Sequence, residues 1–383
     1  MARKSIEANI AYDDTSKLYY VHLDYGKDEN GKRIKKYRTF EKLSDAHKAL
    51  KEFTADKIKG IAIIPKKTSM KEWIEYYLLD IVIPNREKTT VYGYLNMVKN
   101  HIIPALGEIP IQKLTPQQVQ KYYTMLMNEK KLSANSVKKH HNFLKTALKL
   151  AVQQDIILRN PIERVEPPRS KKKDIEFYSK ENLVKLLEHV NGNRLEIIVY
   201  LAVLLGLRRE EICGLQWSSV DFDKRVISIH EAKTMAGSVV INKDTKNKSS
   251  NRTLFISDEL VDALMREMDK QKRNSDMLGN LYIQNDLVVK WENGKEYRPN
   301  YISEVFTKFV KDNHLPKITL HGLRHSFISL GNSQGVTLFN LSKVAGHSTP
   351  DTTGRIYTHL EDETHEDLLT NVSKSLFRKN ETH

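Results

Sequence analysis

The chain has 383 residues, which is long enough for two or three domains with substantial cores. Its 62 Lys and Arg residues outnumber 48 Asp and Glu residues, and the net charge of +14 favours a polyanionic partner, either nucleic acid or an anionic membrane surface. No apolar run could span a membrane, and no signal-peptide pattern is present. Since Cys213 is also the single cysteine, we expect a cytoplasmic protein without an intramolecular disulfide. No motif predicts a metal site or a cofactor.

Residues 1–65 have the pattern of a small strand-rich module. Alternating side chains predict three strands at 5–12, 18–25 and 33–40, and Ser44 begins a helix with an apolar inner stripe. The third strand is dense in cations: Lys32, Arg33, Lys35, Lys36 and Arg38. Such a strand suits a sheet laid against the DNA backbone, and it equally suits a solvated edge strand that lysines protect from aggregation.

Residues 66–168 have the pattern of an all-helical module. Periodicity predicts helices at 70–79, 88–103, 116–128 and 134–154, and Thr115 and Pro116 supply the start signal of the third. The fourth helix has an apolar stripe of Val137, Leu144, Leu148 and Ala151. Its opposite side carries Lys138, Lys139, His140, Lys145 and Lys149. These charges indicate either a solvated face or a surface that meets the DNA backbone.

A polar linker with a cluster of cations follows this module. Residues 160–173 hold two adjacent prolines and little apolar content. The cations are Arg169, Lys171, Lys172 and Lys173. We expect an interdomain linker that lies close to DNA.

The remaining residues begin with a mainly helical pattern. The apolar run 195–205 predicts a buried helix that ends at Gly206, and Arg208 begins the next helix, one turn before Glu211. A surface ion pair between these two charged residues is the simpler interpretation. Strands are expected at 226–230, 238–242 and 253–256. A turn over residues 244–251 is expected to join the last two strands, and a lysine on such a hairpin can either deliver a proton or keep the tip soluble.

Residues 321–357 concentrate polar chemistry at the ends of short helices. Two helices are expected at 320–334 and 338–345, each ended by a glycine, and a third is expected to carry Tyr357. His321, Arg324 and His347 join that tyrosine. A guanidinium, two imidazoles and a phenol suit a phosphate, because they supply donors for its oxygens and a nucleophile for its phosphorus.

Four stretches in this order resemble the signature of the tyrosine recombinases, the phage-type integrases. They are Gly206-Leu-Arg208-Arg-Glu-Glu211, His321-Gly-Leu-Arg324-His-Ser, Ala345-Gly346-His347 and Tyr357-Thr-His359. The turn Thr245 to Arg252 is similar to the hairpin that carries the family's catalytic lysine, with Lys246 as the best match, Lys248 as its rival and Lys243 third. The family more often has a small polar residue in place of Glu210.

The resemblance implies a multidomain α+β fold with three domains. An arm-type DNA-binding domain with a three-stranded sheet and a helix would span residues 1–65, and an all-helical core-binding domain would span 66–168. A mainly α catalytic domain with a small antiparallel sheet would span 169–383. The basic sheet, the fourth helix of the helical module and the linker would then be DNA-binding surfaces.

The resemblance also implies a mechanism without metal or nucleotide. The implied catalytic residues are Arg208, Lys246, His321, Arg324, His347 and Tyr357. Tyr357 would attack a scissile phosphate to form a 3′-phosphotyrosine, the two arginines would clamp its oxygens, and Lys246 would protonate the leaving 5′-oxygen. His321 would accept or share the phenolic proton, and His347 would form a hydrogen bond to the phosphate.

The implied partners are double-stranded DNA, at the ends of a mobile element and at its target, and further copies of the chain. Apolar residues at helical spacing in residues 361–383 are expected to dock on a neighbouring protomer in a tetramer on DNA. An excisionase is a further candidate partner. The alternatives are an Xer-type chromosome recombinase, which would lack the basic sheet, a catalytically idle DNA-binding regulator, and a type IB topoisomerase, which has another module order.

Overall fold

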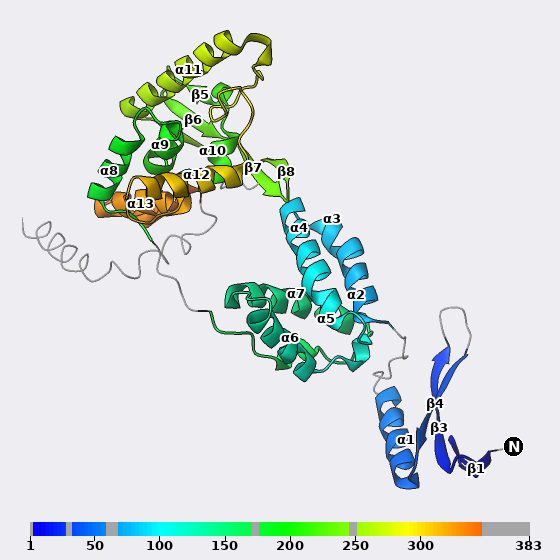
Figure 1. Cartoon of the computed structure of the whole chain (residues 1–383). Coiled ribbons are helices and arrows are strands. Elements are labelled where there is room, and N and C mark those ends of the chain that lie inside the picture. Colours follow the sequence, from blue (N-terminus) through cyan, green and yellow to red (C-terminus); the bar gives the residue numbers. More distant parts are fainter. Residues whose placement is uncertain (1–2, 28–32, 59–67, 171–175, 245–250, 347–383) are drawn as a thin grey trace, which may run out of the picture. The chain divides into compact units, whose positions relative to one another are not determined.

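The computed structural model describes residues 3–27, 33–58, 68–170, 176–244 and 251–346. The chain divides into two units, Met1–Lys171 and Lys172–His383. The first unit holds a small sheet with one helix, followed along the chain by a bundle of helices (Figure 1). The second holds helices around small antiparallel sheets. The expected class of a mainly helical chain with small antiparallel sheets is therefore correct.

Four antiparallel strands and a helix form the N-terminal part: β1 (Lys4–Glu7), β2 (Ile10–Asp13), β3 (Leu18–Lys27), β4 (Arg33–Phe40) and α1 (Leu43–Ile58). The expectation of three strands is wrong, because the predicted strand 5–12 is two strands. Asn9 between them has a left-handed backbone, with φ of 69°, and asparagine adopts this conformation more readily than most residues. The core between sheet and helix contains Ile10, Val21, Leu23 and Ala46.

The helical bundle is built from the following segments: α2 (Met70–Tyr76), η1 (Tyr77–Val82), α3 (Ile83–Asn85), α4 (Lys88–Met97), η2 (Val98–Ile102), α5 (Ile103–Leu106), α6 (Pro116–Asn128) and α7 (Ala134–Gln153). The four predicted helices are all present, but the first two run on through a π-helical segment, η1 or η2, to a proline-containing last turn. Proline lacks an N–H group and clashes with the preceding turn of an α-helix. The wider π turn directly before Pro84 and Pro104 lets each helix continue past its proline.

Two tyrosine–histidine pairs join α6 to α7 inside the bundle. The hydroxyl of Tyr122 lies 2.7 Å from Nδ1 of His140, and that of Tyr123 lies 3.1 Å from Nδ1 of His141. The expectation that His140 belongs to the polar side of α7 is wrong, because both histidines are buried. Burial and the nearby His101 lower the pKa of His140 to about 4, so its imidazole is neutral at pH 7.

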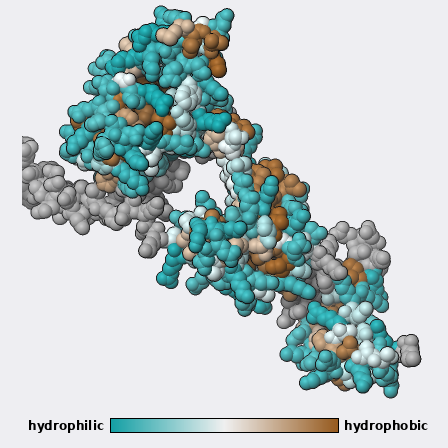
Figure 2. Space-filling view, viewed as in Figure 1, coloured by the Kyte–Doolittle hydropathy of each residue, from teal (hydrophilic) through white to brown (hydrophobic). Residues whose placement is uncertain are grey.

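An exposed hydrophobic area lies on the surface of the helical bundle over the ends of α3 and α4 (Figure 2). The segments η1, α3 and α4 expose Leu79, Ile83, Tyr92 and Leu95, of which Leu79 is 62% exposed. Single exposed apolar residues are common on protein surfaces, whereas a cluster indicates an interaction surface.

The second unit contains α8 (Lys180–Val190), α9 (Glu196–Leu204), α10 (Arg209–Gly214), β5 (Val220–Asp221), β6 (Val226–Ile229), β7 (Glu231–Ala236), β8 (Val239–Asp244), β9 (Arg252–Phe255), α11 (Asp258–Leu278), α12 (Pro299–Asp312), α13 (Leu320–Ser333) and α14 (Leu338–Ala345). The three predicted strands are present as β6, β8 and β9. The expected hairpin between β8 and β9 is wrong, since β8 pairs with β7 and β9 pairs with β6. Sequence patterns missed β7 because its charged and alanine-rich segment has low strand propensity.

Helix α9 is buried along most of its length, as its apolar run predicts. Helices α13 and α14 also agree with expectation, and α14 ends at Gly346 in a left-handed conformation. The expected helix around Tyr357 and the C-terminal tail lie outside the described residues. Among the helices of the described ranges, none is long and apolar enough to cross a membrane.

Replacement of Gly206 by alanine should destabilise the second unit more than the same change at Gly335. Both glycines have positive φ, of 60° and 82°, but a Cβ at Gly206 would lie 2.5 Å from the ring of Phe327, while a Cβ at Gly335 would meet nothing within 4 Å. We expect Gly206→Ala to cost about 1–3 kcal/mol more than Gly335→Ala. Hydrogen exchange of α9 and α13 amides measures this difference, and equal losses of protection would contradict it.

The stability of the α6–α7 pair should fall as the pH drops from 6.5 towards 4. The pKa of His140 falls from about 6.5 in the unfolded chain to about 4 in the fold, so the unfolded state binds the proton first as the pH drops. Stability that is present above pH 6.5 is therefore lost on acidification. The loss should reach roughly 3 kcal/mol at most. Opening free energies of α6 and α7 amides from hydrogen exchange test this, and His140→Gln should show a weaker pH dependence than the unchanged chain.

Candidate active site

Arg208 lies at the start of α10, where a buried carboxylate reaches it. Glu211, one turn later, is only 2% exposed. Its two oxygens accept hydrogen bonds from the backbone amide and from Nη1 of Arg208, each at 2.8 Å. The first bond satisfies an amide that has no partner within the helix. The interpretation as a surface ion pair is wrong, because the acid is buried and only the guanidinium group is partly exposed.

Arg252, the first residue of β9, completes the contacts of the same carboxylate. Its Nη1 and Nη2 donate to the two oxygens of Glu211 at 3.0 and 2.9 Å, and its Nε donates to the carbonyl of Val344 at 2.6 Å. Burial alone would raise the pKa of Glu211, but the hydrogen bonds and charges of Arg252 and Arg208 outweigh burial and keep that pKa below its usual value. Sequence reasoning missed Arg252, whose only signal was its place beside the candidate lysines.

Arg324 lies in the second turn of α13 and is fully buried. Its Nη1 donates to the carbonyl of Gly206 at 2.7 Å, and its Nη2 donates to the carbonyl of Ala345. Its Nε has no hydrogen-bond partner among the described residues. Burial and the positive charge of Arg208 lower the pKa of Arg324 to about 9, so the group is still a cation at pH 7.

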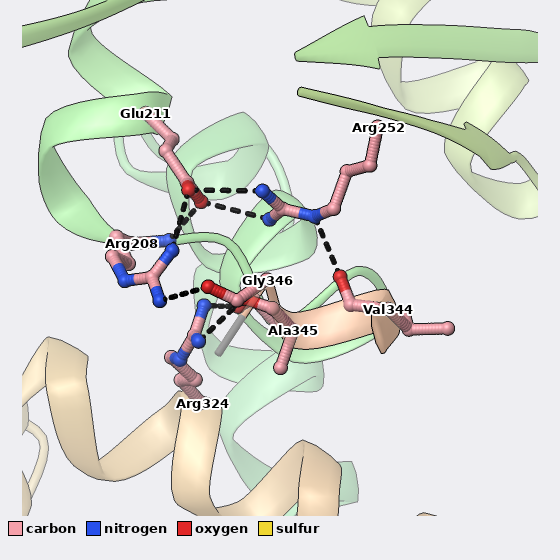
Figure 3. A network of polar contacts seen from close by, with 8 residues as sticks. Arg208, Glu211, Arg252, Arg324, Val344, Ala345 and Gly346 are labelled. Carbon is pink, nitrogen blue, oxygen red and sulfur yellow. Dashed lines mark hydrogen bonds and ion pairs between the residues drawn. The ribbon is translucent and has the colours of Figure 1, made fainter. Parts of the chain in front are cut away.

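Three arginines therefore meet at the C-terminal end of α14 (Figure 3). Three consecutive carbonyls, of Val344, Ala345 and Gly346, accept hydrogen bonds from Arg252, Arg324 and Arg208, respectively. The carbonyl end of a helix carries partial negative charge, which favours nearby cations. One carboxylate and one helix end thus hold three guanidinium groups, and the surplus of positive charge suits an anion such as a phosphate.

His321, on the first turn of α13, lies beside the arginines. Its ring packs edge-on against His325, with 4.6 Å between the ring centroids. The residue is exposed as a whole. Even so, loss of water around the ring and the charge of Arg324 lower the pKa of His321, so the neutral imidazole that can accept a proton is favoured. His325 is half-buried, and burial lowers its pKa to about 4.

The residue that departs from the resemblance, Glu210, has a local partner. Its carboxylate accepts hydrogen bonds from Nη2 and Nε of Arg209, at 2.7 and 3.2 Å, and Nη1 of Arg209 donates to Ser303 on α12. The extra negative charge is therefore balanced next to the site. Within the described ranges, no three His, Cys, Asp or Glu side chains are grouped so that they could hold a metal ion.

Several expected site residues lie outside the described part of the chain. They are Lys32, Lys171, Lys172, Lys173, Lys246, Lys248, His347 and Tyr357. Among the described site residues, Arg208 and Arg324 donate to the adjacent carbonyls of Gly346 and Ala345. The charges of both arginines act on His321, which lies three residues before Arg324 on α13. The catalytic roles of all these residues, described or not, remain predictions from the sequence.

The cations expected to contact DNA are distributed over several surfaces. In β4, Lys35 and Tyr37 share the open face of the sheet, while Lys36 and Arg38 lie on the side that α1 covers. Arg33 forms an ion pair with Asp24 at 2.8 Å. Four further cations are exposed as expected: Lys138, Lys139 and Lys145 on α7, and Arg169.

Comparisons with known families match three parts of the chain. The model of the phage integrase family matches residues 176–364. A model described as the N-terminal SAM-like domain of phage integrases matches residues 69–127, and a model of an arm DNA-binding domain matches residues 9–57.

Individual relatives match most of the chain. A XerC-like tyrosine recombinase of Caldanaerobacter subterraneus subsp. tengcongensis is 28% identical over 91% of this chain and 94% of its own length. The ICEBs1 integrase of Bacillus subtilis is 26% identical over 89% of this chain and 93% of its own.

Solved structures share the fold at low identity. The integrase of the transposon Tn1549, in complex with transposon right-end DNA, matches with a TM-score of 0.69 and 19% identity, over 80% of this chain and 99% of that one. A lambda integrase tetramer bound to a Holliday junction matches with a TM-score of 0.57 and 16% identity, over 93% and 96%. Since the family models, the near-full-length relatives and the fold agree, the chain belongs to the phage integrase family and is a tyrosine recombinase, an enzyme of site-specific DNA recombination.

Proposed function

We propose that this recombinase is the integrase of a mobile genetic element, which it inserts and excises by conservative strand exchange. The observation that carries the proposal is the convergence of Arg208 and Arg324 on the turn of residues 345–346, directly before His347. We infer three domains: an arm-binding domain at 1–65, a core-binding domain at 66–168 and a catalytic domain at 169–383. The matches to 9–57, 69–127 and 176–364 support this division.

In the proposed cleavage step, the phenolic oxygen of Tyr357 forms a bond to the scissile phosphorus while the bond to the 5′-oxygen breaks. Arg208 and Arg324 hold the non-bridging oxygens, because their planar guanidinium groups, both cations at pH 7, match phosphate geometry. Lys246 supplies the proton that the departing 5′-oxygen takes up. The ester to the tyrosine keeps the energy of the broken bond, so a second 5′-hydroxyl can rejoin the strand.

The two histidines would complete this step. A phenol with a reference pKa of about 10 is a weak nucleophile at neutral pH and needs help to lose its proton. His321 is our candidate acceptor of that proton, since its lowered pKa favours the neutral imidazole. His347 would donate a hydrogen bond to the phosphate, whose charge grows as the phenolic oxygen attacks.

The partners we propose are duplex DNA, bound at two kinds of site, and further copies of this chain. The arm-domain match favours an element integrase over an Xer-type chromosome recombinase, which would lack such a domain. The exposed hydrophobic area on η1, α3 and α4 offers a contact between protomers, and the tail at 361–383 a second one. We also propose an excisionase as a partner during excision and a place on the bacterial nucleoid.

A covalent complex with nicked duplex DNA should form without metal. The chain is incubated with its element-end sequence in chelator and resolved on a denaturing gel. Tyr357→Phe should abolish the shifted band while duplex binding persists, because only the attacking oxygen is lost. Tyr301→Phe, which removes a hydroxyl elsewhere in the same unit, should leave the band in place. Binding without any covalent band in the unchanged chain would support the idle DNA-binding regulator instead.

Lys35→Ala should weaken binding to arm-site duplexes and leave cleavage at the core site intact. Loss of one phosphate contact lowers the slope of log affinity against log salt by about 1. Lys48→Ala on α1 is the matched control, because it removes an exposed lysine from the helix that covers the other face of the sheet. Salt titrations of binding to the arm-site and core-site duplexes compare the two variants. Equal effects of Lys35→Ala and Lys48→Ala would argue against DNA contact by the open face.

A further inference from the structure

The guanidinium group of Arg252 forms its hydrogen bonds within the protein. All three nitrogens of its guanidinium group donate to protein acceptors, two to the Glu211 carboxylate and one to the carbonyl of Val344. The side chain is only 8% exposed, whereas that of Arg208 is 30% exposed. Arg324 differs in that its Nε has no partner among the described residues, whereas every nitrogen of Arg252 is engaged. We therefore expect the effect of Arg252 on the reaction to pass through Glu211 and α14.

The Glu211 carboxylate is shared between two arginines. Each of its oxygens accepts one hydrogen bond from Arg252 and one from Arg208. A buried carboxylate needs both neutralising charge and hydrogen-bond donors, since leaving it uncompensated costs several kcal/mol. Without Arg252, Arg208 would be the nearest cation left, and the free lone pairs would draw its guanidinium group further onto the carboxylate.

The contact with Val344 ties the same residue to the end of α14. Val344 precedes the two carbonyls that Arg324 and Arg208 hold. A shift of this turn would therefore move the acceptors of both arginines together. One residue of β9 thus contacts both the carboxylate that binds Arg208 and the helix end whose carbonyls bind Arg208 and Arg324 (Figure 3).

We propose that Arg252 is a positioning residue for strand cleavage: it satisfies Glu211 and holds the last turn of α14, and so keeps the Arg208 guanidinium available to the scissile phosphate. This inference rests on the proposed recombinase mechanism. Arg252 exchanges no proton with the substrate and forms no bond to it. Its loss should consequently slow the covalent step and leave DNA affinity nearly unchanged.

The test is single-turnover formation of the covalent complex by the full-length chain on nicked duplex DNA. Arg252→Met should slow this step by about 100-fold, the size of effect that misplacement of a catalytic group by about 1 Å can have. Arg252→Lys keeps the charge but not the forked contact, so its rate should lie between those of the unchanged chain and Arg252→Met. Adding Glu211→Gln to Arg252→Met should restore about tenfold, because it removes the carboxylate that captures Arg208.

A control variant tests whether the loss of any paired arginine slows cleavage, and hydrogen exchange tests whether the fold is intact. Arg266→Met removes an arginine that is also paired with a carboxylate, that of Glu196, but far more exposed, at 51%. This variant should cleave at the unchanged rate. Hydrogen exchange in α9 and α12 should be the same in every variant, so that a slow rate is not loss of the fold.

The pH dependence provides the readout that a purely structural role would not move. Arg252→Met removes the largest opposition to burial and leaves only that of Arg208, so the pKa of Glu211 should rise. At low pH the Glu211 carboxyl group of Arg252→Met is neutral and no longer captures Arg208, so this single variant and the Arg252→Met, Glu211→Gln double variant should cleave at similar rates. As the pH rises, the carboxyl group ionises in the single variant only. The double variant should then become increasingly faster than Arg252→Met alone.

Two results would overturn the proposal. One is an unchanged rate in Arg252→Met, and the other is a further loss in the double variant at every pH. A failure of the unchanged chain to form the Tyr357-dependent complex would reject the recombinase mechanism itself, and the role of Arg252 with it.

Discussion

A single buried carboxylate constrains the arrangement of the described site. Glu211 is nearly inaccessible to water, and a carboxylate in that position is stable only with cations and donors around it. Arg208 and Arg252 supply both, from the start of α10 and the start of β9. The requirement to satisfy one acid thereby fixes two guanidinium groups that lie far apart in the sequence.

The second constraint is the carbonyl end of α14. Backbone carbonyls at a helix end lack partners within the helix, and here three arginine side chains satisfy three of them. These hydrogen bonds orient the guanidinium groups in the protein without DNA. Such preorganisation is the main way in which proteins stabilise charge that develops during phosphoryl transfer. A low-exposure site with excess positive charge also explains why the pKa of Arg324 is lowered.

Several features of the fold followed from the sequence for local reasons. The apolar run of α9 predicts burial, Thr115 with Pro116 predicts the start of α6, and the glycine at 346 predicts the end of α14. Local patterns failed where pairing partners decide the outcome. Strand β7 has weak propensity and exists through its partner β8, while Asn9 divides one apparent strand into two.

For the site, the sequence by itself determined the residue types and their order: an arginine box, a lysine-rich turn, and the HxxR and GH motifs with a tyrosine beyond them. These residue types are recognisable because they suit a phosphate: cations and imidazoles donate to its oxygens, and a phenol can attack its phosphorus. The tertiary structure alone decided that Glu211 is buried, that Arg252 shares it with Arg208, and that His140 faces the core. Burial and shared hydrogen bonds depend on which segments meet in space, and sequence spacing carries no record of such long-range contacts.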